Sequence, residues 1–232
     1  MKKTEKQMSD SFFMGILLAI VGGYLDAYTY IARGQVFANA QTGNIVLLGM
    51  NIAYGNMIKA LSYLPPIFAF MAGIFIAEKI KKHSRKTFLH WRQSVLLVEL
   101  AVIILVTLMP SGKQNGINYD MTANVLISFV CSLQVQSFRR ISGVVCATTM
   151  CTGNLRSATE GLSLYMSNHD RKALSNSLKY FGIVAFFVIG AVISTYLTTI
   201  FWTHSVVFSA AGLIAAILLM FISPDTHPQA TP

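Results

Sequence analysis

The residues best suited to chemistry form a motif that occurs twice, Thr42-Gly43-Asn44 and Thr152-Gly153-Asn154. Each copy combines a hydroxyl, a residue that tolerates unusual backbone angles, and an amide that both donates and accepts hydrogen bonds. Thr and Asn cap helix starts, where unpaired N–H groups attract anions and polar solutes. The pattern therefore predicts two capped helices that bind a small polar solute between them. A purely structural turn at each copy is the alternative.

The similarity extends beyond the tripeptides at a constant offset of 110 positions. Equivalent residues upstream are Asp26 and Gln136, Ala38 and Thr148, and Asn39 and Thr149. Downstream, a few residues of loop insertion in the second half bring the apolar segment 66–73 into correspondence with 183–190, and both end in glycine. These matches predict an internal duplication, with a first repeat at 1–112 and a second at 113–232.

Several polar residues near the motifs are candidate site residues. Asn39 and Gln136 are expected to contact the solute. Asp26 interrupts the first apolar segment, and an ionised side chain there costs about 3 kcal/mol. We expect Asp26 to be a coupling group for a proton or cation, with capping of backbone amides as the alternative. Arg156 would favour an anion, although Glu160, four residues later, could neutralise it.

The other residues with reactive or charged side chains are predicted to have structural roles. Glu99 is expected to pair with a basic residue such as Arg92, with a proton relay as the alternative. Cys146 and Cys151 are expected to serve as small packing residues. The five histidines have no ligand spacing, so neither a metal nor a cofactor is predicted. Arg139 and Arg140 are expected to anchor a helix end and contact phospholipids.

Composition indicates a membrane protein. Hydrophobic residues make up 54% of the chain and charged residues only 12%, with a mean hydropathy of +0.56. A soluble domain has about 25% charged residues. The net charge of +9 is spread over loops between apolar segments rather than gathered in a basic domain, which argues against nucleic acid as a partner.

Charge also discriminates between topologies. If the helices predicted at 44–56 and 154–167 crossed the membrane, eight spans would result, and the basic stretch 79–92 would lie outside. If they are re-entrant, six spans place all but three of the 18 Lys and Arg residues toward the cytoplasm. The exceptions are Arg33, Lys59 and Lys113. The six spans are expected at about 11–32, 59–78, 93–109, 120–139, 174–197 and 204–222.

The predicted fold is an all-α membrane protein with six transmembrane helices and two re-entrant or broken half-helices. Three spans per repeat is an odd number, so the repeats have opposite orientations and form an inverted 3+3 arrangement. Proteins of this kind hold their substrates near the bilayer midplane, between the repeats. Irregular backbone is tolerated at that depth only inside protein or beside a watery cavity.

The pattern resembles the YoaK-like family of bacterial membrane proteins. The residues that carry the resemblance are Gly22-Gly23-Tyr24-Leu25-Asp26-Ala27, Ala38 to Asn44, Gln136, Arg139-Arg140 and Thr148 to Asn154. The resemblance spans most of the chain and implies a multispan inner-membrane protein of about six spans. It carries over no substrate. With the basic N-terminal tail inside, six spans predict that both termini are cytoplasmic.

The function predicted is transport of a small polar solute, an anion in preference to a cation, bound at midplane between the two tripeptides. A channel, or a membrane sensor or scaffold that transports nothing, remains as an alternative. An enzyme is least favoured, because the sequence shows no nucleophile motif and no metal-binding set. The expected partners are the solute and membrane lipids, and a homo-oligomer is left open.

Overall fold

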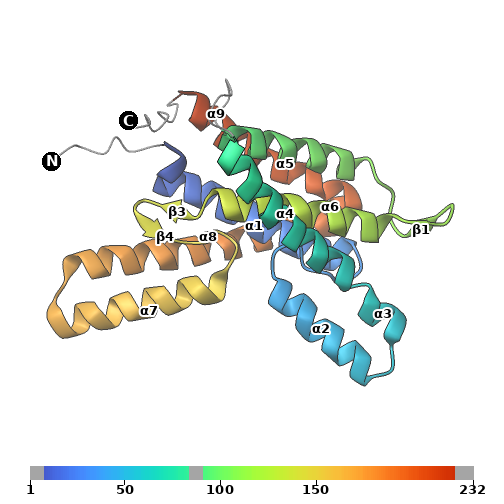
Figure 1. The fold of residues 1–232 in the computed structure, drawn as a ribbon, viewed down its shortest axis with the longest axis horizontal. Coiled ribbons are helices and arrows are strands. Elements are labelled where there is room, and N and C mark those ends of the chain that lie inside the picture. The colour runs from blue at the N-terminus through green and yellow to red at the C-terminus, as the bar shows by residue number, and fades with distance from the viewer. Residues whose placement is uncertain (1–7, 84–90, 223–232) are drawn as a thin grey trace.

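The computed structural model describes residues 8–83 and 91–222, and most of them lie in helices, as the all-α expectation requires. Figure 1 shows long helices packed around α1, with the α7–α8 hairpin extending to one side and α2 to the other. In chain order the elements are η1 Met8–Asp10, α1 Phe12–Ala32, α2 Gln41–Ala53, α3 Met57–Leu61, α4 Leu64–His83, α5 Trp91–Thr107, β1 Lys113–Gln114, β2 Ile117–Asn118, α6 Tyr119–Ser137, β3 Arg140–Ile141, β4 Val144–Val145, α7 Cys151–Asn168, α8 Arg171–Phe201, η2 Trp202–Phe208 and α9 Ser209–Ile222.

The most extensive helix packing joins elements from opposite halves of the chain. Helix α1 packs against α8, and α6 packs against α4. Glycine permits both approaches: a side chain at Gly190 would overlap the α1 backbone at Ile20, and one at Gly73 would overlap the α6 backbone at Phe129. Small residues let helix backbones come this close. Gly73 and Gly190 are equivalent in the sequence alignment of the halves, so both make the same kind of crossing.

The outer surface is apolar, as in a chain that contacts lipid. Three stretches of the described residues are long and apolar enough to cross a membrane: 12–32, 57–82 and 171–222. The six spans expected from the sequence are therefore not all found. Helix α5 has 17 residues, and α6 carries buried Asn124, Ser128 and Gln134. Large apolar side chains such as Ile58, Phe68 and Val192 point outward, which a lipid environment favours.

The longest apolar stretch is interrupted at Trp202. This residue adopts a left-handed backbone conformation with φ 50°, which ends α8 and begins the short helix η2. Two tyrosines of α1 hold η2 in place: Tyr24 donates its hydroxyl to Ser205 O at 2.6 Å, and Tyr28 donates to Thr203 O at 2.8 Å. Because the chain bends here, α9 returns to pack on α1 and α5.

Two small β-hairpins flank α6. The turn between β1 and β2 is Asn115-Gly116, and the turn between β3 and β4 is Ser142-Gly143. All four turn residues have positive φ. This is the geometry of a type I′ turn, which Asn-Gly strongly favours. The Asn-Gly pair was thus a readable signal for the first hairpin.

Candidate functional site

A cavity of 440 Å³ lies where the starts of α2 and α7 approach α1, α4 and α8. Of the ten residues that the sequence singled out, five line it: Asp26, Asn39, Thr42, Thr152 and Gly153. The structure thus brings both tripeptides to one cavity, although α2 and α7 extend in different directions from it (Figure 1). The remaining lining residues are Gly23, Ala27, Phe37, Ala40, Gln41, Phe70, Thr149, Met150, Cys151, Phe187 and Ala191.

The tripeptides are not the helix caps that the sequence predicted. Helix α2 begins at Gln41 and α7 at Cys151, so each tripeptide lies in the first turn. The N-cap residues are Ala40 and Met150, and neither makes a side-chain capping bond. A helix start leaves four N–H groups without intrahelical partners. The expected capping role is therefore wrong, and the amides of the first turns need other acceptors.

The asparagines of the two tripeptides hold the chain that leads into each helix. Asn44 donates to the backbone oxygen of Phe37 at 2.8 Å and accepts from its N–H at 2.9 Å. Asn154 donates to the backbone oxygen of Ala147 at 2.7 Å. Both asparagines are buried and both partners lie seven residues earlier. Neither asparagine lines the cavity, and nor does Gly43, whose α-carbon packs beneath the Phe37 ring.

Asp26 performs the capping for α2 from a distance. Its Oδ1 accepts the backbone N–H of Asn39 at 2.6 Å and that of Ala40 at 3.4 Å, immediately before the helix begins. The side chain is 5% exposed. The N-terminal end of a helix carries about half a positive charge, which stabilises a carboxylate there. The carboxyl of Asp26 thus satisfies amides that no local side chain reaches.

Gln136, the counterpart of Asp26, does not perform the same task. Its Nε2 donates to Glu78 Oε1 on α4, and it does not line the cavity. Within the described part of the chain, the backbone amides of Cys151, Thr152 and Gly153 have no hydrogen-bond acceptor. Asp26 thus holds the two residues before α2, whereas among the described residues no carboxylate contacts the start of α7, and Met150, the counterpart of Ala40, donates its N–H to Ala147 O at 3.3 Å instead.

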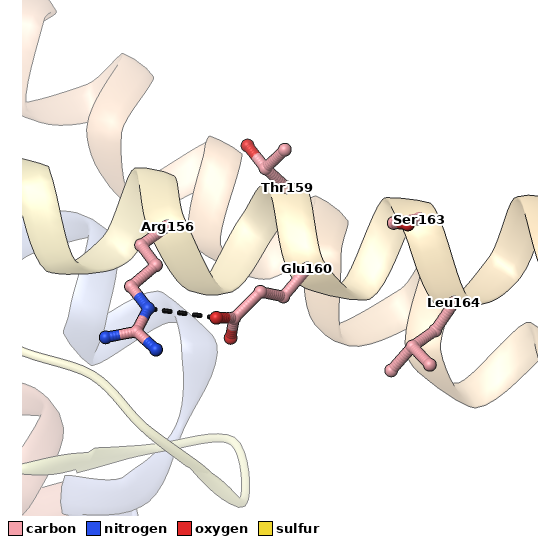
Figure 2. Close-up of a pocket in the computed structure, with 5 residues that line it drawn as sticks. All are labelled: Arg156, Thr159, Glu160, Ser163 and Leu164. Atoms are coloured by element: carbon pink, nitrogen blue, oxygen red, sulfur yellow. Dashed lines mark hydrogen bonds and ion pairs between the residues drawn. The ribbon is translucent and has the colours of Figure 1, made fainter.

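Arg156 is not part of the cavity. It lies on the outer face of α7, where its Nε donates to Glu160 Oε1 at 2.9 Å (Figure 2). Both side chains are largely exposed, at 80% and 59%. An exposed i,i+4 pair of this kind stabilises a helix by about 0.3–0.5 kcal/mol. Glu160 therefore pairs with Arg156, as the alternative expectation had it. Arg156 does not line the cavity, so it supplies no positive charge there to favour an anion.

Glu99 does not have the basic partner that the sequence suggested. It is fully buried on α5, and neither carboxyl oxygen has a hydrogen-bond partner among the described residues. The nearby Arg92 instead donates its Nε to the backbone oxygen of Ser137 at 3.0 Å. The pairing expected between Glu99 and Arg92 is therefore wrong. Helix α5 places the two residues nearly two turns apart, with Arg92 at its first turn.

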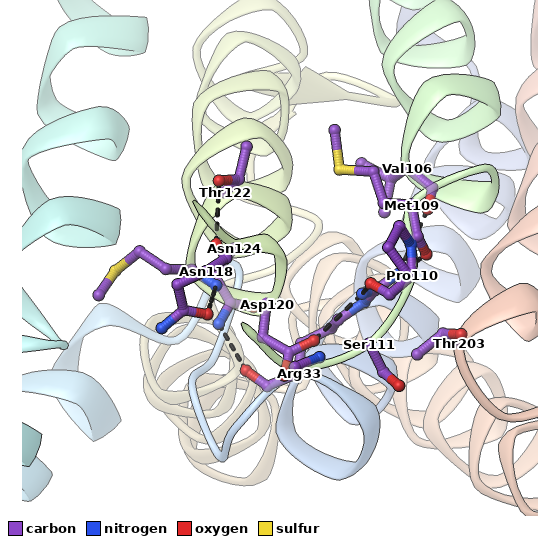
Figure 3. Close-up of polar contacts among 12 residues, drawn as sticks. Arg33, Val106, Met109, Pro110, Ser111, Asn118, Asp120, Thr122, Asn124 and Thr203 are labelled. Atoms are coloured by element: carbon purple, nitrogen blue, oxygen red, sulfur yellow. Dashed lines mark hydrogen bonds and ion pairs between the residues drawn. The ribbon is translucent and has the colours of Figure 1, made fainter. Parts of the chain in front are cut away.

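A second polar centre surrounds Arg33, which is fully buried despite its place at the end of α1. Figure 3 shows its guanidinium group among residues of α5, α6 and the segment that joins them. Nη1 donates to Pro110 O at 2.6 Å and to Asp120 Oδ1 at 3.1 Å. Nε donates to the Tyr28 hydroxyl at 2.8 Å. With Nη2 bonded to the backbone oxygens of Val106 and Met109, every donor is used. This centre joins the end of α1 to α5 and to the start of α6.

The cysteines show no arrangement for redox or metal chemistry. Cys146 is buried in a cluster with Ala19, Ile141, Val144 and Ile183. Burial raises the pKa of its thiol to about 11, so the thiol is uncharged at neutral pH and is a poor nucleophile. The described residues contain no group of three or more His, Cys, Asp or Glu side chains that could hold a metal ion.

Sequence reasoning missed the apolar part of the cavity wall. Phe37 of the segment before α2, Phe70 of α4 and Phe187 of α8 converge only in the fold. In an apolar chain, a phenylalanine at a lipid-facing position has the same local pattern as one beside a cavity. Thr149 was noticed only as the counterpart of Asn39, yet it lines the same wall. The duplication was the signal that could have placed both residues together.

Comparison with known proteins agrees with the membrane assignment. The chain is 24% identical over 207 residues to a UPF0700 transmembrane protein, YoaK of Bacillus subtilis (strain 168), an alignment that covers 88% of this chain and 90% of the relative. No solved structure matches the chain. A family model described as "Protein of unknown function (DUF1275)" matches residues 14–220. The chain is therefore a membrane protein and belongs to this DUF1275 family.

Proposed function

We propose that this protein is a transporter that carries a small polar solute across the bacterial inner membrane. The observation that carries the proposal is the single cavity onto which both tripeptide-bearing helices open. Its volume of 440 Å³ falls within the range of about 300–1,000 Å³ typical of small-molecule sites. Unpaired amides at the start of α7 offer donors to an anionic group of the solute.

The transport mechanism rests on an inverted 3+3 repeat with six spans and cytoplasmic termini. In this arrangement α2 enters the membrane from outside and α7 from the cytoplasm, and the two helices meet near midplane. The equivalent crossings at Gly73 and Gly190 support such a repeat, because at each of them a helix of one half packs closely on a helix of the other half. Rocking of one pair of helices, α1 with α8 or α4 with α6, would then expose the cavity to each side in turn.

Asp26 is the coupling group in this mechanism. It lines the cavity, it caps α2, and no Lys, Arg or His among the described residues forms an ion pair with it. A cation or proton that binds its carboxyl would weaken the hold on Asn39 and Ala40. Movement of α2 would thus depend on the occupancy of the cavity.

The topology can be tested by labelling single cysteines with an impermeant maleimide in right-side-out and inverted vesicles. The positions Met57 and Lys113 are exposed and should react from the periplasmic side, whereas Lys172 should react from the cytoplasmic side. These sites are introduced as Met57→Cys, Lys113→Cys and Lys172→Cys in a chain whose native cysteines are replaced. If positions 57 and 113 both react from the cytoplasmic side, α2 crosses the membrane and the mechanism fails.

Transport itself can be tested with protein reconstituted in lipid vesicles and labelled lactate, choline and phenylalanine as probes. A side chain at Gly153 meets no atom within 4 Å, so Gly153→Leu should fold and occupy part of the cavity. The same change at Gly49, which is equally unobstructed but lies on α2 away from the cavity, is the matched control. Uptake should fall at least tenfold in Gly153→Leu only. Equal uptake by both variants would show that the solute does not pass through this cavity.

A further inference from the structure

The two helix starts at the cavity differ in one respect that points to the ligand. At α2, the carboxyl of Asp26 accepts the amides of Asn39 and Ala40. The offset of 110 positions puts Gln136 in the corresponding place for α7, but Gln136 bonds to Glu78. The start of α7 consequently has no carboxylate in the position that Asp26 takes for α2.

The α7 side of the cavity has several hydrogen-bonding groups without partners. The amides of Thr152 and Gly153 have no acceptor among the described residues. Thr149, which lines the same wall at 5% exposure, has a hydroxyl with no partner in that part of the chain. Buried polar groups are normally hydrogen-bonded. A carboxylate of the ligand would supply the missing acceptor and meet the positive end of an 18-residue helix.

The α2 side of the cavity requires the opposite charge. Asp26 is the only charged side chain among the described lining residues, and it lacks a cationic partner there. Both of its amide hydrogen bonds end on Oδ1, and a carboxylate has acceptor capacity on both oxygens. The Oδ1 of Asn39, on the same wall, is also without a donor. An ammonium group would neutralise the buried carboxyl and donate to both oxygens.

The rest of the cavity wall is largely apolar. Phe37, Phe70 and Phe187 line the cavity together with Ala27 and Ala191. Aromatic walls stabilise an apolar ligand group by excluding water from it. The volume of 440 Å³ leaves room for one such group beside the two charges.

We propose that the cavity binds a zwitterion with an apolar side chain, of the amino-acid type, with its carboxylate at the start of α7 and its ammonium group at Asp26. The ligand carboxylate would then accept the amides of Thr152 and Gly153, whereas Asp26 accepts the amides of the two residues before α2. This assignment rests on the proposed transport function, because it names the class of solute that the same cavity would carry.

The test compares three probes that share one apolar group: phenylalanine, 3-phenylpropionate, which lacks the ammonium group, and 2-phenylethylamine, which lacks the carboxylate. Binding to the purified full-length protein is measured by calorimetry. Because hydrogen bonds to charged groups contribute about 1.5–3 kcal/mol, each single-charge probe should bind at least about tenfold more weakly than phenylalanine. Equal or tighter binding of 3-phenylpropionate would assign the cavity to anions and overturn the proposal, as would binding of none of the three.

Two variants test which side of the cavity binds the ammonium group and which binds the carboxylate. Asp26→Asn keeps an Oδ1 acceptor for α2 and should remove the preference for phenylalanine over 3-phenylpropionate. Gly153→Ala adds a methyl group in open space beside the α7 amides and should weaken both carboxylate probes while sparing 2-phenylethylamine. Unchanged preferences in both variants would overturn the assignment. Phenylalanine that binds without being taken up by vesicles would overturn transport alone, whereas uptake of lactate or choline without phenylalanine binding would overturn the ligand class alone.

Discussion

The side-chain amide of Asn154 donates a hydrogen bond to the backbone oxygen of Ala147 at 2.7 Å, seven residues earlier in the chain. Asn44 makes the corresponding bond to Phe37 and adds two more, to the Phe37 N–H and to Gln41 Oε1. The third residue of each tripeptide thus fixes the segment that brings the chain to the cavity. Both asparagines therefore stabilise the fold directly, and neither contacts the cavity.

Replacement of these asparagines should therefore act on stability, and unequally. Asn154→Ala removes the hydrogen bond to Ala147 O and should lower the free energy of unfolding by about 1 kcal/mol. Asn44→Ala removes three hydrogen bonds and leaves the half-buried Phe37 backbone groups without these partners, so a loss of about 2–3 kcal/mol is expected. Denaturant unfolding in detergent would measure both. Equal losses would contradict the difference between the two networks.

The helix crossings at glycine should tolerate no side chain. Gly73→Ala and Gly190→Ala place a methyl group against the backbone of α6 and α1, and overpacking of this kind costs about 1–3 kcal/mol. Gly49→Ala meets no atom within 4 Å and should be neutral or stabilise α2 by up to about 1 kcal/mol. Thermal unfolding of the three variants is the measurement. A loss at Gly49 as large as at the crossings would show that the effect is not steric.

Arg33 should resist even conservative replacement. Lysine has three donors on one nitrogen, whereas Arg33 uses three nitrogens: Nε donates to Tyr28, Nη1 to Pro110 and Asp120, and Nη2 to Val106 and Met109. Breaking a buried ion pair on one side costs about 3–5 kcal/mol, and Arg33→Lys should approach the lower end because Asp120 is 23% exposed. Lys59→Arg, at an exposed position, is the control and should leave unfolding unchanged.

Cys146 should give the protein an alkaline stability decrease. Burial raises the pKa of its thiol to about 11, against about 8.5 for a free cysteine. Between these values the unfolded chain has released the proton and the folded chain retains it. The stability contribution is thus complete below about pH 8.5 and is lost as the pH rises toward 11. Cys146→Ala should flatten the decrease in denaturant unfolding measured between pH 8 and 10; an unchanged slope would assign it to other groups.

Local patterns predicted the helices well. Apolar segments and polar interruptions placed α1, α5 and α6 within a few residues of their observed bounds. The tripeptides were located correctly at helix starts but were given the wrong position, because Thr, Gly and Asn are equally compatible with a cap and with a first turn. Ala40 and Met150, the observed N-caps, have no side chain that signals capping.

Contacts between distant elements were the part that sequence could not supply. The amides at Asn39 are satisfied by Asp26 on another helix, and Gln136 is drawn away by Glu78. Neither pairing follows from spacing along the chain, because both depend on how α1, α4 and α6 pack. The same holds for Glu99, whose unpaired burial is a result of packing and not of its neighbours in sequence.

The buried Arg33 also bears on biosynthesis. Its side chain is made early, at the end of α1, yet its acceptors at Val106, Met109, Pro110 and Asp120 leave the ribosome only after more than seventy further residues. Until then a guanidinium group must remain hydrated or near lipid phosphates. The first helix of this protein is therefore expected to settle into its final depth only when the beginning of α6 has been translated.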